Sequence, residues 1–305
     1  MEQENVIRQE NPRTGVHVLI SLSVYIGLYF FLSMVLSVAA YLGLGLSGVH
    51  GSYTLSQYAV IQTASLLASV LPALFVLKYC DYRPFSDLGL SIRGRWKDFL
   101  YGLLVAVLLY GIGFGLSLAL GEVRIMGVHF SFTNLAGSFG VCILIALTEE
   151  IMIRGYVLGR LLRTRLNKFL SLLISSVLFS LMHLFNPNVA FLPMLNLVLA
   201  GCLLGAAFLY TRNLWFPISL HLFWNWLQGP VLGYKVSGIE LCPPMLQLQL
   251  PENTILNGGT FGFEGSIICT ILMIVLTGSI IWYFERRKCR SIGSLTYKIT
   301  YLTQC

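Results

Sequence analysis

Residues 135–158 read LAGSFGVCILIALTEEIMIRGYVL, an apolar run of helical length that contains two adjacent glutamates and an arginine. A helix needs about 20 apolar residues to cross the hydrocarbon core of a bilayer. A charged side chain at the centre of such a helix costs about 2.5 to 3.5 kcal/mol, so these ionisable residues need a reason to be there. The stretch therefore predicts a membrane-spanning helix that carries a functional site.

Seven similar runs lie elsewhere in the chain, and together they predict an all-α, polytopic bundle of about eight transmembrane helices. The chain is 56% hydrophobic and only 11% charged, whereas a soluble domain carries roughly 25% charged residues. No change in composition marks a second domain, so residues 1–305 are expected to form a single membrane domain. The runs are approximately residues 18–46, 55–77, 99–120, 135–158, 169–185, 191–210, 214–227 and 266–284.

The basic residues predict the orientation of this bundle. With the N-terminus inside, 18 of the 20 Lys and Arg residues fall in inner segments or at the adjoining helix ends, and only Arg124 and Lys235 fall outside. Basic residues are enriched on the cytoplasmic side of membrane proteins, so we expect a multi-pass protein of the cell membrane with both termini in the cytoplasm. Residues 228–265 would then form an outer loop. Basic residues spread in this way do not indicate a nucleic-acid-binding surface.

Few polar side chains capable of proton transfer or strong hydrogen bonding lie inside the apolar runs or at their edges. Glu150 and Arg154 are four residues apart and share a helix face, so the cation can neutralise that carboxylate. Glu149 points about 100° away and is free for another task. The ionisable residues well inside the runs are Glu149, Glu150, His183 and His221, with Arg154 and Asn225 close by.

Helix lengths predict that these residues meet at a similar depth. Glu149 lies 14 residues before Arg163, which is about 21 Å of helix. His183 lies 15 residues after Lys168, which is about 22 Å of helix. Asn225 lies 13 residues after Arg212, which is about 20 Å of helix. His221, four residues earlier, lies about 6 Å closer to Arg212. The side chains are therefore expected to converge on one cavity.

The polar residues form three motifs, EEIMIR (149–154), FSLMH (179–183) and HLFWN (221–225). In this order, each within an apolar run, they resemble the CPBP family, also called the Abi family. That family comprises CAAX prenyl proteases of the type II endopeptidase kind and bacteriocin-processing enzymes. The resemblance covers residues 135–228, which form the motif-bearing core, and the DLGL segment at 87–90 is also similar.

The resemblance implies an intramembrane endopeptidase that cleaves a hydrophobic or membrane-anchored peptide within the lipid bilayer. Glu149 and His183 would activate a water molecule for attack on the peptide carbonyl. His221 and Asn225 would form the oxyanion hole. General acid–base catalysis and oxyanion stabilisation are the two kinds of chemistry that such residues can supply.

Glu150 and Arg154 would brace this site. Proteins of this type are often labelled metalloendopeptidases, and Glu149, His183 and His221 are plausible zinc ligands. The HExxH signature of zinc proteases is missing from the sequence, so we expect a metal-independent mechanism without a cofactor. A zinc-dependent version of the same protease is the alternative.

Other protease classes lack their signatures, because the chain has no GxSxG serine elbow and no aspartate within any apolar run. A different class of function is a non-enzymatic membrane protein, such as a bacteriocin self-immunity factor or a transporter that relays protons. The presence of all three motifs favours the enzyme. A transporter would be expected to show inverted repeats, and the sequence has none.

Overall fold

The computed structural model describes residues 15–45, 53–251 and 254–302. Within these ranges each of the eight predicted apolar runs coincides with a helix, so the all-α architecture is confirmed. The helices are α1 (Gly15–Gly43), α2 (Leu55–Tyr79), α3 (Trp96–Ala119), α4 (Phe132–Glu150), α5 (Gly159–Leu161), α6 (Lys168–Leu181), α7 (Phe191–Thr211), α8 (Trp215–Trp226) and α9 (Ile267–Leu302).

Six helical segments in the described part of the chain are long and apolar enough to cross a membrane by length and composition. The two remaining predicted spans form shorter helices, because α6 has 14 residues and α8 has 12. The chain is therefore a multi-pass membrane protein. The six long segments are Gly15–Gly43, Leu55–Tyr79, Trp96–Ala119, Phe132–Leu161, Phe191–Thr211 and Ile267–Arg287.

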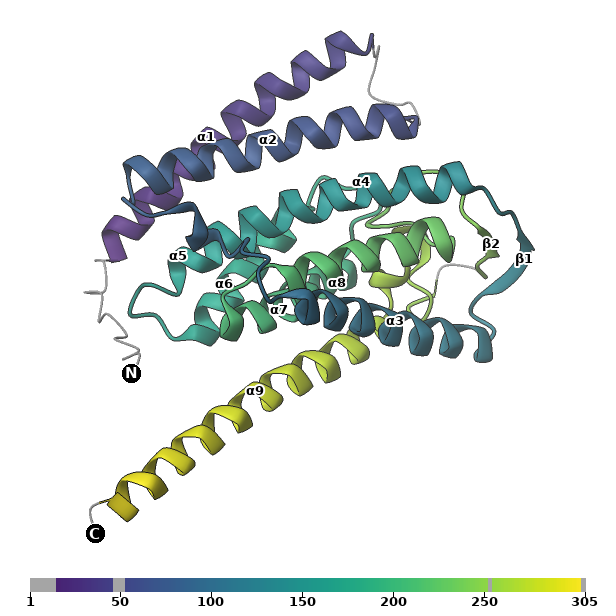
Figure 1. The fold of residues 1–305 in the computed structure, drawn as a ribbon. Coiled ribbons are helices and arrows are strands. Elements are labelled where there is room, and N and C mark those ends of the chain that lie inside the picture. Colours follow the sequence, from purple (N-terminus) through teal and green to yellow (C-terminus); the bar gives the residue numbers. More distant parts are fainter. Residues whose placement is uncertain (1–14, 46–52, 252–253, 303–305) are drawn as a thin grey trace.

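The start of α1, the α5–α6 connection and the end of α9 lie at one end of the bundle (Figure 1). Strands β1 (Arg124–Val128) and β2 (Leu246–Gln249) lie at the opposite end. The segments assigned to the inner side are thus gathered together, as the distribution of basic residues requires. Residues 1–14, which include Arg8 and Arg13, lie outside the described residues, so the cytoplasmic location of the termini stays a prediction.

Helix α7 packs against α6, α8 and α9 and so joins the segments that carry the motifs. Gly201 on α7 allows the closest approach to α6, since a Cβ atom there would lie 2.7 Å from the Cα of Ser176. Small residues at such crossings let helix backbones approach within van der Waals contact. This approach places the Gly201 carbonyl next to the buried Arg154.

The first motif lies where α4 changes its hydrogen-bonding pattern. After Glu150 the chain continues as a π-helix over Ile151–Leu158, all eight residues of which are buried, and then returns to an α-helical turn. Such wider turns are rare and are frequently found at functional sites. The segment is held at its far end by fully buried Asp81, which accepts hydrogen bonds from Tyr156 (3.2 Å) and from Ser21 on α1 (3.0 Å).

Helix α6 ends earlier than the apolar run predicts. The run extends to residue 185, but the helix stops at Leu181, and His183 lies in the following turn, where its N–H donates to the Ser180 carbonyl at 3.0 Å. Beyond Leu181 the backbone continues in tighter turns, in which the N–H groups of Leu184 and Asn186 also bond to the carbonyl three residues before. The placement of His183 within a helix was therefore wrong.

The outer loop, residues 228–265, has more structure than the sequence indicates. It begins with a π-helical turn (Leu227–Val231) and contains β2, which pairs antiparallel with β1 from the α3–α4 connection. Two short 3₁₀ turns (Gly259–Phe261 and Phe263–Gly265) precede α9. The sheet holds the middle of the loop, and the 3₁₀ turns bring its C-terminal end back towards the helices of the motifs.

Candidate active site

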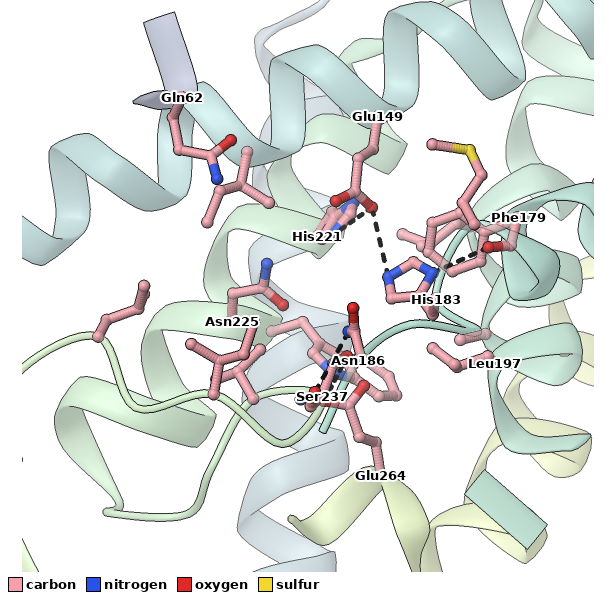
Figure 2. Close-up of a pocket in the computed structure, with 18 of the residues that line it drawn as sticks. Gln62, Glu149, Phe179, His183, Asn186, Leu197, His221, Asn225, Ser237 and Glu264 are labelled. Atoms are coloured by element: carbon pink, nitrogen blue, oxygen red, sulfur yellow. Dashed lines mark hydrogen bonds and ion pairs between the residues drawn. The ribbon is translucent and has the colours of Figure 1, made fainter. Parts of the chain in front are cut away.

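A cavity of about 240 Å³ lies between α4, α7, α8 and the turn after α6. Four of the residues predicted to be catalytic line it together, namely Glu149, His183, His221 and Asn225 (Figure 2). Glu149 lies on α4, His221 and Asn225 lie on α8, and His183 lies in the turn after α6. The expected convergence on one cavity is confirmed, and the chemical role of each residue stays a prediction.

The carboxylate of Glu149 faces both imidazole rings. Its Oε2 atom lies 4.0 Å from Nε2 of His183 and 3.8 Å from Nε2 of His221. This oxygen is buried and makes no hydrogen bond with any described residue. Polar atoms separated by more than 3.5 Å are well placed to share a bridging water. The arrangement is therefore suited to holding one small polar molecule among the three side chains.

Each of the two histidines also forms a hydrogen bond through Nδ1, and that bond determines whether its Nε2 atom can donate or accept. Nδ1 of His183 lies 2.9 Å from the carbonyl oxygen of Phe179, which can only accept, so Nδ1 carries the proton. Nδ1 of His221 lies 2.8 Å from Oε1 of Glu150 and donates in the same way. In a neutral imidazole the remaining nitrogen is an acceptor. When the two rings are neutral, each therefore directs a lone pair towards Glu149.

Glu150 and Arg154 do not line the cavity but are buried behind it. Nη1 of Arg154 donates to Oε1 of Glu150 at 2.7 Å, and Nη2 donates to the Gly201 carbonyl at 3.2 Å. The guanidinium also lies 4.5 Å from the centre of the Phe179 ring. The predicted pairing of Glu150 with Arg154 is confirmed. Its contact with His221 was not predicted, since it links residues of two helices.

The outer loop contributes polar residues to the same cavity that the motifs did not indicate. Ser237 and Glu264 line it from the loop, and Asn186 lines it from the turn that carries His183 (Figure 2). Asn186 donates from Nδ2 to the Ser237 carbonyl at 3.2 Å, so the loop and the His183 turn are joined. Only the charge of Glu264, two residues before the last apolar run, was visible in the sequence.

The three atoms that face one another are of the type that binds zinc, but their spacing is wide. Zinc bonds to nitrogen and oxygen are about 2.0 to 2.2 Å in tetrahedral sites, which sets neighbouring ligand atoms roughly 3.4 Å apart. The Glu149 oxygen lies 3.8 and 4.0 Å from the two nitrogens. Among residues 15–45, 53–251 and 254–302, no group of three or more His, Cys, Asp or Glu side chains is disposed to hold a metal ion.

Residues 130–227 match the family model described as Type II CAAX prenyl endopeptidase Rce1-like. The matched range contains all three motifs and the four residues that line the cavity, so the resemblance to the CPBP family is confirmed over this part of the chain. The match indicates a peptidase of the CAAX intramembrane type. No curated protein and no solved structure matches the chain.

Proposed function

We propose that this protein is an intramembrane endopeptidase that hydrolyses a peptide bond in a hydrophobic or membrane-anchored peptide. Water activated by Glu149 and His183 would attack the peptide carbonyl, without a metal ion. The observation that supports this best is the position of Glu149 Oε2, buried and opposite Nε2 of both histidines. The 4.0 Å between Glu149 Oε2 and His183 Nε2 leaves room for one water oxygen about 2.8 Å from each atom, which would donate a hydrogen to both.

The proposed reaction transfers protons in two stages. Glu149 takes a proton from the water as its oxygen attacks the carbonyl carbon, which forms a tetrahedral oxyanion. The proton is then delivered to the amide nitrogen, directly or through His183. The carbon–nitrogen bond breaks, and a carboxylic acid, which keeps the second proton of the water, and an amine are released. His183 suits this relay because Phe179 holds the proton on Nδ1 and leaves Nε2 to accept and return a second one.

Asn225 and His221 would stabilise the oxyanion. The side chain of Asn225 lies one helical turn beyond His221 and lines the cavity, so its amide N–H can be directed at the developing charge. His221 can donate from Nε2 only as an imidazolium, because Nδ1 already donates to Glu150. A preorganised donor of this kind typically contributes 10²- to 10³-fold in rate, about 2.7 to 4 kcal/mol.

The function can be tested by comparing the membrane peptides of cells that carry the wild-type chain with those of cells that carry Glu149→Gln. Quantitative mass spectrometry of membrane fractions would identify precursors that accumulate and products that disappear in the variant. The glutamine is nearly isosteric, so the variant is expected to insert normally. Glu240→Gln, on the exposed part of the outer loop, is the matched control.

Each protein would then be purified into lipid nanodiscs and tested on the identified precursor. The wild type and Glu240→Gln should cleave it, and Glu149→Gln should not. Normal turnover of that precursor by Glu149→Gln would show that the assigned base is wrong. Identical membrane peptides in all strains, together with no cleavage by the purified protein, would favour a binding or transport role for the polar cluster.

A further inference from the structure

Glu264 is a carboxylate in the active-site cavity that the proposed chemistry does not use. It precedes α9 on the outer loop, is 5% exposed and lines the cavity. Its Oε1 atom accepts hydrogen bonds from Nε2 of Gln228 (2.8 Å), from the backbone N–H of Ser237 (2.5 Å) and from Oγ of Ser237 (3.2 Å). The carboxylate is thus held in one position by three donors.

All three of these donors go to the same oxygen. Oε2 of Glu264 has no hydrogen-bond partner among the described residues, although the side chain borders the cavity (Figure 2). Anchoring Oε1 alone does not require a charge, because the amide oxygen of a glutamine would accept the same hydrogen bonds. A buried charge costs several kcal/mol unless it is paired. We therefore expect Oε2 of Glu264 to pair with a group that does not belong to this chain.

The cavity lining offers no permanent positive charge to balance its two carboxyl groups. Its lining contains the carboxyl groups of Glu149 and Glu264 and the imidazoles of His183 and His221, but no Lys or Arg. Arg154, which is buried nearby, is already paired with Glu150. A cavity lined by one sign of charge attracts ligands of the opposite sign and repels its own.

We propose that Glu264 forms a subsite for a cationic side chain of the substrate, the ammonium of Lys or the guanidinium of Arg, near the bond that is cleaved. The inference rests on the proposed peptidase function and adds its substrate class, an apolar peptide with a basic residue at one fixed position. Oε2 receives the cation, and the hydrogen bonds to Oε1 keep the carboxylate oriented before the substrate arrives. Preorganisation of this kind reduces the entropic cost of binding.

The test uses the full-length protein in nanodiscs and apolar peptides in which one Lys is moved through the central positions. Each peptide is paired with one that has norleucine at the same place. We expect Lys at one position relative to the cleaved bond to raise kcat/KM about tenfold over norleucine, the size of one charge-assisted contact. Glu264→Gln should reduce that ratio to about 1, whereas Glu240→Gln should keep it.

Binding of the same peptides to Glu149→Gln separates this inference from the proposed function. The Lys peptide should bind more tightly than its norleucine partner, and the difference should vanish in Glu149→Gln/Glu264→Gln. If peptides bind with this difference but the wild type cleaves none, the cation subsite stands and the peptidase assignment fails. If wild-type cleavage shows no preference for Lys, or Glu264→Gln retains it, the subsite is refuted and the peptidase assignment stands.

Inhibition of the wild-type protein by small compounds provides a test that does not depend on the folding of Glu264→Gln. Butylammonium should inhibit cleavage of the Lys peptide by the wild type more strongly than butanol, which has the same chain length but no charge. Equal inhibition by the two compounds would count against the subsite. Butylammonium should also inhibit cleavage of the Lys peptide more strongly than cleavage of the norleucine peptide. Such a difference would support competition between butylammonium and the Lys side chain for the Glu264 carboxylate.

Discussion

Nδ1 of His221 lies 2.8 Å from Oε1 of Glu150, the same oxygen that accepts a hydrogen bond from Arg154 at 2.7 Å. A continuous chain of hydrogen bonds therefore runs from the buried guanidinium to the wall of the cavity. The sequence indicated that Glu150 and Arg154 brace the site, and the structure shows what they contact. Glu150 sets the tautomer and the orientation of His221, and Arg154 holds Glu150 in place.

Arg154→Ala is expected to lower the stability of the protein by about 3 to 5 kcal/mol, because it leaves Glu150 as an unpaired buried charge. The double variant Glu150→Leu/Arg154→Met removes both charges and should recover much of the folded yield. It should not recover cleavage, since His221 loses the acceptor for Nδ1. Thermal unfolding in detergent gives the first quantity, and peptide cleavage gives the second. Full activity in the double variant would contradict an orienting role for Glu150.

Asn225→Asp is expected to lower kcat by about 10²- to 10³-fold, because a carboxylate in place of the amide cannot donate to the oxyanion. The side chains are similar in size, so KM and the unfolding temperature should change little. Steady-state kinetics with a confirmed substrate separate the two parameters. Asn188→Asp, at an exposed position of the α6–α7 connection, is the matched control. A rise in KM with unchanged kcat would instead assign Asn225 to substrate binding.

The preference for a Lys-containing peptide is expected to depend on pH. Burial raises the pKa of Glu264 above that of an ordinary carboxyl, and the hydrogen bonds from Ser237 and Gln228 and the charge of His183 oppose the shift only in part. As pH falls through this raised pKa, Glu264 becomes neutral and its attraction for the ammonium is lost. The ratio of kcat/KM for the Lys peptide to that for the norleucine peptide should therefore fall on acidification. The fall should begin at a pH above that at which an ordinary glutamate becomes protonated.

The ratio is the informative quantity because the ionisable side chains of Glu149, His183 and His221 also face the cavity. An effect of pH on these side chains changes cleavage of both peptides, so the comparison of the two peptides removes the part that they share. Measurement between about pH 5 and 8 spans the region above the unperturbed glutamate value. A ratio that is constant, or that rises as the pH is lowered, would contradict the assignment of the cation to Glu264.

The helices and the convergence of the motif residues could be predicted because apolar length and the spacing of polar residues are local properties of the sequence. The end of α6 could not, because Leu184 and Phe185 continue the apolar run past the point where the helix stops. His183 nevertheless reaches Glu149. The π-helical turn after Glu150 was also missed, since its apolar sequence is compatible with an ordinary α-helix.

The part of the site formed by the outer loop had no signal in the sequence. Glu264 is drawn into the cavity by hydrogen bonds from Gln228 and Ser237, which lie 36 and 27 residues away in the chain. No helical or strand periodicity relates such positions. From the sequence alone Glu264 resembled the other acidic residues of a Pro- and Gly-rich loop. Only the tertiary structure distinguishes it from exposed Glu240.

The last prediction concerns metal. If Glu149 and His183 activate the water unaided, strong chelators should leave cleavage unchanged, and the purified protein should contain no stoichiometric zinc. The physical basis is the spacing of the potential ligands, since the Glu149 oxygen lies 3.8 and 4.0 Å from the two histidine nitrogens. Tetrahedral zinc would draw these atoms to roughly 3.4 Å from one another.

Elemental analysis of the protein purified without chelator measures the metal content, and cleavage after dialysis against a chelator measures the dependence. Zinc would lower the pKa of a bound water and polarise the substrate carbonyl, so its removal would stop turnover if it took part. Zinc near one equivalent per chain, with activity lost on chelation and restored by zinc alone, would overturn the metal-independent mechanism. Glu149, His183 and His221 would then be its ligands, and Glu149→Gln would lose zinc as well as activity, whereas Glu264→Gln would retain the metal.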